Sequence, residues 1–366
     1  MFSLHVDTAR TWRGGQNQVL LTVNGLHARG HRVVLVAHPD GELGNRAADG
    51  LELIPIAPRT EMDLAAAWKF ARLVKKLAPD VIHAHDGHGV ALAALALALG
   101  AASAGGRAPA LLAARRVDIH LRGHALARWK HRQVDCFIAA SEAIRHMLVA
   151  DGVPQERTVT VYEGIDVDRV RAAPPVPVHD AFGLPHHMPV VGNVAALVPH
   201  KGQRYLIDAA HRVVQQMPDA RFVILGEGKL REQLEHQVRA QQLEQHVLLP
   251  GFRTDVLGCL KGFDLFVMSS VREGLGTSLL DAMACARPIV ATRAGGIPEI
   301  VEDKVNGVLV PPCDADALAD AIVQQLRDAT RRRQLGEAGL ARVRERFTVE
   351  RMVEQTAEVY AQVVHL

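Results

Sequence analysis

Short apolar runs rich in β-branched residues alternate with longer segments of helical period along most of this chain. Such alternation is typical of βαβ units, in which helices join parallel strands. In the first half, strands are predicted at residues 2–6, 32–37, 80–85, 111–114, 136–140 and 158–161. In the second half they are predicted at 190–194, 221–225, 247–249, 264–268, 289–291 and 308–310. The predicted fold class is therefore α/β, with two doubly wound, Rossmann-like domains.

A proline-rich segment separates the two halves. Residues 171–189 carry five prolines and no clear period, which indicates a linker. At 366 residues the chain also exceeds the size at which one hydrophobic core stops growing. We expect an amino-terminal domain over 1–172, a second domain over 173–345, and a helix over 346–366 that could return to the first domain. Two such sheets facing each other would bind ligands in a shared cleft, at the carboxyl ends of their strands.

Composition narrows the classes of function. A formal net charge of +2 argues against nucleic-acid binding. The four cysteines form no C-x-x-C pair, which favours a reducing compartment without structural zinc. The amino terminus shows no export signal, and the longest apolar stretch, residues 90–102, is too short to cross a bilayer. We therefore expect a cytoplasmic protein.

The most informative motif lies between Ser269 and Asp281. An apolar strand is predicted to end at Met268, a glycine-containing loop follows, and a helix is predicted to begin near Thr277. Glu273 would then sit just past the strand, and Asp281 one turn inside the helix. Free amides at a helix start attract phosphate groups, and carboxylates on either side could bind sugar and ribose hydroxyls. An ordinary strand–loop–helix with a surface glutamate is the alternative for the motif taken alone.

Two further loops carry residues suited to a phosphate ligand. Lys201 follows the strand predicted at 190–194 and could neutralise a leaving diphosphate. Gly14 and Gly15 lie between the first strand and the next helix, where glycines allow close approach of the backbone to a ligand. The alternatives are a solvated lysine and a tight turn without a ligand.

Three histidines, His83, His85 and His88, surround the end of the strand predicted at 80–85. No carboxylate of the same period joins His83 and His85, so a packed or solvated pair is favoured over a metal site. A lone histidine is seldom catalytic, but His85 ends the strand at the edge predicted to bind ligands.

Taken together, these motifs resemble those of glycosyltransferase family 4, of the group 1 type. The segment from Glu273 to Asp281 resembles the E-x7-E element of the family, and residues 291–299 resemble its next glycine-rich loop. Pro199-His-Lys-Gly, Gly14-Gly15, the H-x-H ending at His85 and Gly164-Ile-Asp are further similarities. The resemblance covers nearly the whole chain, in order and at matching spacing.

The resemblance implies a GT-B fold and a retaining glycosyltransferase that needs neither metal nor cofactor, with the nucleotide-sugar as substrate. The donor would be bound mainly by the second domain and the acceptor mainly by the first. Glu273, Lys201 and His85 would be the catalytic residues, and Asp281 would hold the ribose. The donor phosphates would meet Gly14, Gly15 and the backbone of Leu275, Gly276, Thr277 and Ser278.

The sequence also departs from the family pattern. Asp281 stands where a glutamate is usual, and Ala196 stands where an arginine is usual, so Arg13 or Arg272 could supply that charge. After the fourth predicted strand, Ala114-Arg-Arg replaces a frequent histidine. The alternatives are a nucleotide-sugar epimerase or a phosphorylase of the same fold, or a non-enzymatic binding protein with two lobes.

A basic segment in the first half bears on the acceptor. Residues 107–132 carry seven Lys and Arg against one acid, Asp118, a net charge of +6. The simpler explanation is a solvated helix face. The functional hypothesis is a surface for an anionic partner, either a phosphorylated glycolipid acceptor or the inner membrane face, where Trp129 could add an interfacial anchor. An acceptor in lipopolysaccharide, glycolipid or other envelope glycan synthesis is therefore expected.

Overall fold

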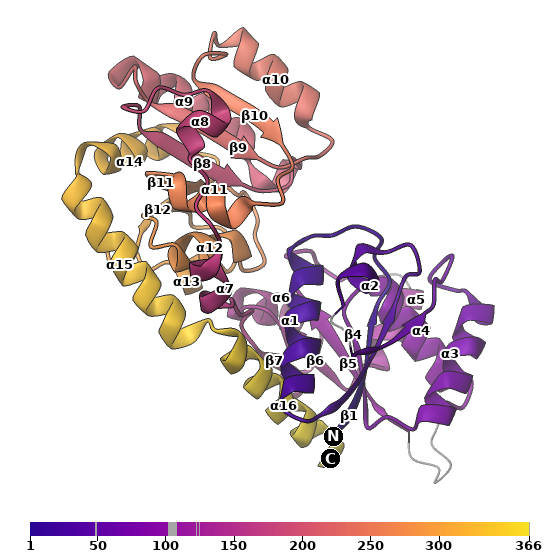
Figure 1. Cartoon of the computed structure of the whole chain (residues 1–366). Helices are drawn as coiled ribbons and strands as arrows, with labels where there is room; N and C mark the ends of the chain where they lie inside the picture. Colours follow the sequence, from indigo (N-terminus) through magenta and orange to yellow (C-terminus); the bar gives the residue numbers. More distant parts are fainter. Residues whose placement is uncertain (48–49, 102–107, 122, 124, 366) are drawn as a thin grey trace. The chain divides into compact units, whose positions relative to one another are not determined.

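The protein folds into two units, each built on one parallel sheet (Figure 1). This computed structural model describes residues 1–366 except 48–49, 102–107, 122, 124 and 366. Unit 1 comprises Met1–Gly164 and Val349–Leu366, and unit 2 comprises Ile165–Thr348. The two Rossmann-like sheets predicted from the sequence are thereby confirmed.

Unit 1 has a seven-stranded sheet in the order β3-β2-β1-β4-β5-β6-β7. Its strands are β1 (Phe2–Asp7), β2 (Arg32–Ala37), β3 (Glu52–Pro55), β4 (Val81–Ala84), β5 (Ala110–Arg115), β6 (Cys136–Ala139) and β7 (Thr158–Thr160). Strand β3 was not predicted from the sequence, and it lies at the sheet edge and is mostly exposed. An edge strand buries little apolar surface, so it has no strong alternation to detect.

Helices cover both faces of this sheet. They are α1 (Gly14–Ala28), α2 (Glu42–Arg46), α3 (Leu64–Leu77), α4 (Gly87–Ala98), α5 (Ala125–Arg132), α6 (Glu142–Ala150) and α16 (Val349–His365). Helix α4 is buried nearly all round, and the backbone of Val6 lies 3.2 Å from where a Cβ of Gly89 would be. The interpretation of this Ala-rich stretch as a helix packed closely on a sheet is confirmed.

Helix α16 is the carboxyl-terminal part of the chain and packs against α1 on one face of the unit 1 sheet. The two helices approach so closely that a Cβ at Gly25 would lie 2.4 Å from Val353. The chain leaves unit 1 after Gly164, eight residues before the expected boundary at 172, and returns at Val349. Ile165 and Thr348 are the first and last residues of unit 2, and they form a parallel β-bridge.

Unit 2 has a six-stranded sheet in the order β10-β9-β8-β11-β12-β13. Its strands are β8 (Val190–Val194), β9 (Arg221–Leu225), β10 (Val247–Gly251), β11 (Leu265–Met268), β12 (Ile289–Thr292) and β13 (Val308–Val310). All six overlap predicted strands, because most of their residues are apolar and buried. The edge strand β10 is less buried, with Leu248 and Leu249 half-buried and Pro250 exposed.

The helices of unit 2 begin at Val167, before the segment 171–189 that was predicted to be a linker. That segment holds the end of α7 (Val167–Ala172) and α8 (Val178–Phe182), and Val176 donates a backbone hydrogen bond to Gly258. The linker prediction was wrong in this respect, since the whole segment belongs to unit 2 and part of it is helical. The other helices are α9 (Gln203–Gln216), α10 (Arg231–Ala240), α11 (Val256–Gly262), α12 (Thr277–Ala284), α13 (Ile297–Ile300), α14 (Ala315–Arg327) and α15 (Ala329–Arg346).

Candidate functional site

In unit 2, Lys201 and Glu273 form an ion pair at the carboxyl ends of neighbouring strands. Lys201 ends a 3-10 turn (Pro199–Lys201) after β8, and Glu273 lies in the loop after β11. The Lys201 Nζ atom is 2.6 Å from Glu273 Oε2, and Ser270 Oγ donates to the same oxygen at 3.0 Å. The two charged side chains are 19% and 10% exposed. Such a pair is desolvated enough to be strong and exposed enough to meet a ligand.

The backbones of the two loops are held together by hydrogen bonds. Val271 N donates to His200 O at 2.8 Å, and Ser269 Oγ donates to Lys201 O at 3.2 Å. Between them lies Gly202, whose φ is +66° and whose Cβ, if present, would lie 2.1 Å from Ser269 O. Only glycine fits this contact, so the Pro-His-Lys-Gly sequence fixes the place of Lys201.

A third loop, after β12, fixes the backbone of Glu273. Gly296 N donates to Glu273 O at 3.2 Å, and Thr292 Oγ1 donates to Ser270 O at 2.6 Å. Gly295 has φ +51°, and a Cβ there would lie 1.8 Å from Glu273 O. The glycine-rich loop identified in the sequence therefore positions the carboxylate of the preceding loop.

Helix α12 begins next to this ion pair. Its N-cap is Gly276, with φ +98°, no side chain caps its first turn, and that turn contains no acid. Leu275 is buried, while Thr277 and Ser278 are half-buried. The amides of a helix start without an acidic cap suit an anionic ligand such as a diphosphate.

Asp281 lies one turn further along α12 and is half-buried. Burial raises the pKa of its carboxyl group to about 7, and the positive charge of Arg169 on α7 opposes this shift only in part. Within the described part of the chain, its carboxylate accepts no hydrogen bond. A buried carboxyl group with this pKa is suited to a hydroxyl ligand, because a hydrogen bond from the ligand would favour its charged form.

Ala196 occupies the position where an arginine is usual, so this position supplies no positive charge. Ala196 contributes only its backbone, whose carbonyl accepts from Gln203 Nε2 at 2.9 Å. Of the two replacements considered, Arg272 belongs to the Glu273 loop and is exposed, and Arg13 is the N-cap residue of α1 in unit 1.

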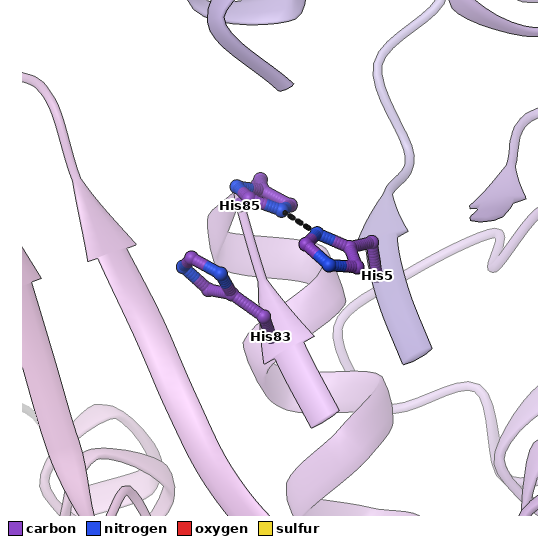
Figure 2. A group of neighbouring side chains, drawn as sticks. All are labelled: His5, His83 and His85. Atoms are coloured by element: carbon purple, nitrogen blue, oxygen red, sulfur yellow. Dashed lines mark hydrogen bonds between the residues drawn. The ribbon is translucent and has the colours of Figure 1, made fainter. Parts of the chain in front are cut away.

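In unit 1, three imidazole rings gather on β1 and at the end of β4 (Figure 2). The strand register places His5 beside His83, so both rings point to the face covered by α1 and α16. His85 follows β4, and its Nε2 lies 2.9 Å from His5 Nδ1. His5 and His83 are fully buried, and His85 is 8% exposed. His83 and His85 were candidates from the sequence, but His5 was not, because only the pairing of β1 with β4 brings it to them.

Arg116 sets the direction of the hydrogen bonds in this cluster. Its Nη1 lies 3.1 Å from His85 Nδ1, and an arginine can only donate. His85 therefore carries its proton on Nε2 and donates to His5, which in turn donates from Nε2 to Ser3 Oγ at 3.1 Å. Burial and then the charge of Arg116 lower the pKa of His5 to about 3. The hydrogen-bonded imidazoles are therefore neutral at physiological pH.

Tyr360 of α16 completes the cluster. Its hydroxyl lies 2.7 Å from His83 Nδ1 and 3.5 Å from His5 Nε2. Because His5 carries its proton on Nε2, Tyr360 donates to His83. Burial, followed by neighbouring imidazoles and Arg116, holds the pKa values of His83 and His85 well below the usual range. His83 also lines a cavity of about 20 Å³ together with Thr22, Arg116, Glu163 and Thr356.

Three clustered histidines could instead bind a metal ion. Their ligand atoms lie within 4.8 Å of one another, which is close enough for a shared ion. However, the facing nitrogens of His5 and His85 are joined by a hydrogen bond, and His85 accepts from a cation. An ion would have to replace these bonds beside a positive charge, so the donor set does not fit a metal.

Arg116 was noted in the sequence only as part of a basic segment and of the tripeptide that replaces a histidine. In the structure its Nε lies 3.1 Å from Glu163 Oε1, and both side chains are largely buried. A Cβ placed on Gly15, in the first turn of α1, would lie 4.0 Å from the Arg116 side chain. Helix α1 starts at Gly14 without a side-chain cap or an acid in its first turn. Arg116, His85 and Gly15 thus lie together at one edge of the sheet.

A buried carboxylate, Asp7, also lies at this edge and was not singled out in the sequence. It ends β1 and accepts from Ala9 N at 3.0 Å and Gln16 Nε2 at 3.2 Å. Burial raises the pKa of Asp7, and the nearby charge of Asp86 raises it further. Its position in the strand would have been the available signal, because ligands bind at carboxyl strand ends.

The basic segment 107–132 is not one surface. Lys130 is buried, with its Nζ 2.7 Å from Glu61 Oε2, and Arg116 is paired with Glu163. Trp129 is half-buried and packs against the core of unit 1. Arg107 and Arg122 lie outside the described residues. Lys130 and Arg116 therefore do not contribute to an exposed basic surface, while Arg128 and Arg132 are exposed, and contact of this segment with an anionic partner stays a prediction.

Comparison with known proteins agrees with this architecture. The whole chain superposes on Anabaena HepE, solved in complex with UDP-glucose, with a TM-score of 0.85 at 22% identity, covering 99% of this chain and 100% of HepE. The protein thus has the GT-B fold, with its two Rossmann-like domains.

Sequence relatives then define the family. Residues 12–169 match "Glycosyltransferase Family 4" and residues 178–342 match "Glycosyl transferases group 1". Alpha-maltose-1-phosphate synthase of Mycolicibacterium smegmatis is 32% identical over 266 residues, which is 66% of this chain and 67% of that enzyme. N-acetyl-alpha-D-glucosaminyl L-malate synthase of Bacillus anthracis is 27% identical over 310 residues, 82% of this chain and 80% of the relative. This chain belongs to glycosyltransferase family 4, group 1, and is a glycosyltransferase.

Proposed function

We propose that this glycosyltransferase moves a sugar from a nucleoside-diphosphate sugar to a hydroxyl group of a cell-envelope glycan or glycolipid, with retention of anomeric configuration. The observation that carries the proposal is the Lys201–Glu273 pair at the start of α12, which places a cation, a carboxylate and free helix amides together. A diphosphate and the sugar attached to it present the complementary groups. HepE, which shares the fold, was solved with UDP-glucose.

In this proposal unit 2 binds the donor. Glu273 contacts hydroxyls of the donor sugar, and the backbone from Leu275 to Ser278 binds the diphosphate. Asp281 accepts from the ribose. Lys201 stabilises the charge that develops on the leaving diphosphate, which is the kind of interaction that lowers a transition-state barrier most. The leaving phosphate takes the proton of the acceptor hydroxyl, so no protein nucleophile is needed.

Unit 1 binds the acceptor in this proposal. His85, whose two ring nitrogens are engaged by Arg116 and His5, acts as a neutral hydrogen-bonding group. It holds the Arg116 guanidinium at the carboxyl edge of the sheet, near Gly14 and Gly15. We place the protein in the cytoplasm, at the inner face of the membrane. Among the described residues, no helix combines the length and apolar character required to span a bilayer.

The test is a two-stage assay. Thermal-shift screening against nucleotide-sugars first identifies the donor, because a ligand that binds the folded state raises Tm. The donor is then incubated with lipid and glycan acceptors, and NMR of the product reports its anomeric configuration. Inversion would contradict the proposed stereochemistry, and turnover of the donor without any acceptor would indicate an epimerase. Activity dependent on inorganic phosphate and a glycan would indicate a phosphorylase.

The same assay tests the proposed independence of metal and cofactor. We expect the purified enzyme to keep its activity after dialysis against EDTA, since Lys201 and the amides of α12 neutralise the diphosphate. Loss of activity that magnesium or manganese restores would contradict this mechanism.

A further inference from the structure

The outward face of α3 carries large apolar side chains toward its amino-terminal end and basic side chains toward its carboxyl-terminal end. Leu64 and Trp68 are 59% and 57% exposed, and Met62, in the preceding turn, is 49% exposed. The exposed basic residues of the helix are Lys69, Arg72, Lys75 and Lys76. Leu64–Leu77 contains no acid. We call these seven residues the α3 surface.

The fold does not require this surface. The opposite face of α3 already supplies Ala67, Phe70 and Val74 to the core of unit 1. Isolated exposed apolar residues are common in proteins, but Leu64 and Trp68 are four residues apart and therefore share one helix face. The guanidinium of Arg72 lies 4.8 Å from the centre of the Trp68 ring, so the apolar and basic parts are contiguous.

The charge of the α3 surface is uncompensated within the chain. In the part of the protein that the structure describes, no ion pair involves Lys69, Arg72, Lys75 or Lys76. Of the two acids before the helix, Asp63 caps it by accepting from Ala66 N, and Glu61 holds Lys130. The surface therefore presents four positive charges to a partner.

The topology of the sheet places the apolar end near the candidate site. Helix α3 follows β3 in a parallel sheet, so its amino-terminal end lies toward the carboxyl edge of that sheet. The same edge carries His85 and the start of α1 at Gly14. An apolar surface inserted at that end would bring this edge close to the lipid.

We propose that the α3 surface docks unit 1 on an anionic lipid bilayer. Met62, Leu64 and Trp68 enter the interfacial region, and the four basic residues bind the headgroups. Tryptophan favours this depth because its ring is apolar with a polar edge, and basic side chains gain from the negative surface potential. An acidic protein would explain the charge but would leave three exposed apolar side chains at one end without a role.

The purpose of this contact rests on the proposed glycolipid acceptor, but the contact itself can be measured without donor or acceptor. The full chain is sedimented with phosphatidylcholine vesicles that contain either no anionic lipid or half phosphatidylglycerol. We expect binding only to the anionic vesicles, weakening as added salt screens the headgroups. Trp68 fluorescence should shift to shorter wavelength on binding, and Trp68→Phe should lose most of the shift.

Matched variants locate the surface. The triple variant Lys69→Gln, Lys75→Gln, Lys76→Gln should bind anionic vesicles about a hundredfold more weakly, at about fivefold for each charge. The triple variant Arg327→Gln, Arg333→Gln, Arg344→Gln removes the same charge from exposed positions of unit 2 and should bind like the wild type. Leu64→Ser with Trp68→Ser should weaken binding even at low salt. Circular dichroism and Tm confirm that each variant is folded.

Several results would overturn the proposal. They are absence of wild-type binding to anionic vesicles, equal binding to neutral vesicles, or equal loss in the two triple variants. Self-association that Leu64→Ser with Trp68→Ser abolishes, without vesicle binding, would assign the surface to a second copy of the chain. Sugar transfer to a water-soluble acceptor should be unchanged in the α3 variants, so failure of this proposal and failure of the proposed function remain distinguishable.

Discussion

The two sheets share a parallel architecture, yet their candidate sites handle charge in opposite ways. In unit 2, Lys201 and Glu273 remain partly exposed, and three loops hold them side by side. In unit 1, His5, His83 and His85 form a buried neutral chain whose direction is set by one arginine. The carboxyl end of a strand can therefore present charged side chains to a ligand, as in unit 2. It can also carry neutral histidines that hold a charged arginine in place, as in unit 1. Substitutions in each unit test this contrast.

Glu273→Gln should have the largest effect. The change keeps the volume and the bond from Ser270 but removes the charge beside the proposed reacting carbon, so we expect kcat to fall at least about a hundredfold. The half-buried Lys201 loses its counter-charge, which should cost about 1–3 kcal/mol of folding free energy. Steady-state kinetics and thermal unfolding measure both. Glu244→Gln, at an exposed position of unit 2, is the control, and wild-type turnover in Glu273→Gln would remove Glu273 from the mechanism.

Lys201→Ala should weaken binding of the nucleoside diphosphate about 10- to 100-fold while leaving binding of the nucleoside nearly unchanged. The physical reason is that a charge-assisted bond to phosphate contributes about 1.5–3 kcal/mol and the nucleoside has no phosphate. Calorimetry with the two ligands gives the ratio, and Lys229→Ala serves as an exposed lysine control. Equal weakening of both ligands would mean that Lys201 acts through the fold of its loop.

Asp281→Asn should change how stability depends on pH. Burial raises the folded-state pKa of Asp281 to about 7, from 3.8, so the folded state binds more protons than the unfolded state between these values. Stability from this group is therefore fully present below about pH 4 and is lost as pH rises through about 7, by roughly 1–4 kcal/mol. Urea unfolding at pH 5 and pH 8 should show a smaller difference in Asp281→Asn than in the wild type. An identical difference in both proteins would assign the pH dependence to other groups.

Tyr360→Phe should have the smallest effect, and it tests the neutral chain of unit 1. Loss of the hydroxyl removes the donor to His83 Nδ1, which should lower the free energy of unfolding by about 1 kcal/mol. Nitrogen NMR of the histidine rings reports the tautomers directly. We expect His83 to lose its single tautomer in the variant while His85, held by Arg116, keeps its proton on Nε2. Unchanged His83 resonances would show that the ring is fixed by packing alone.

The sequence by itself determined the strands of both sheets apart from β3, and it predicted Glu273 and Lys201 as residues of the unit 2 candidate site. Buried parallel strands are apolar runs with local boundaries, and Gly202 and Gly295 mark turns that no other residue could adopt. Glu273 and Lys201 follow such strands directly. Their prediction needed only local pattern and the resemblance that the motifs carry.

The tertiary structure alone decided which distant groups meet and in what state of charge. Lys201 pairs with Glu273 across 72 residues, and Tyr360 reaches His83 across 277 because the chain returns to unit 1 at Val349. Packing buried Lys130 and left Trp129 half-buried, where their charge and amphipathic character had suggested an exposed membrane face. Contacts between distant segments and the degree of burial depend on how whole elements pack, and burial fixes the pKa. Neither the long-range contacts nor the degree of burial is encoded in a local stretch of sequence.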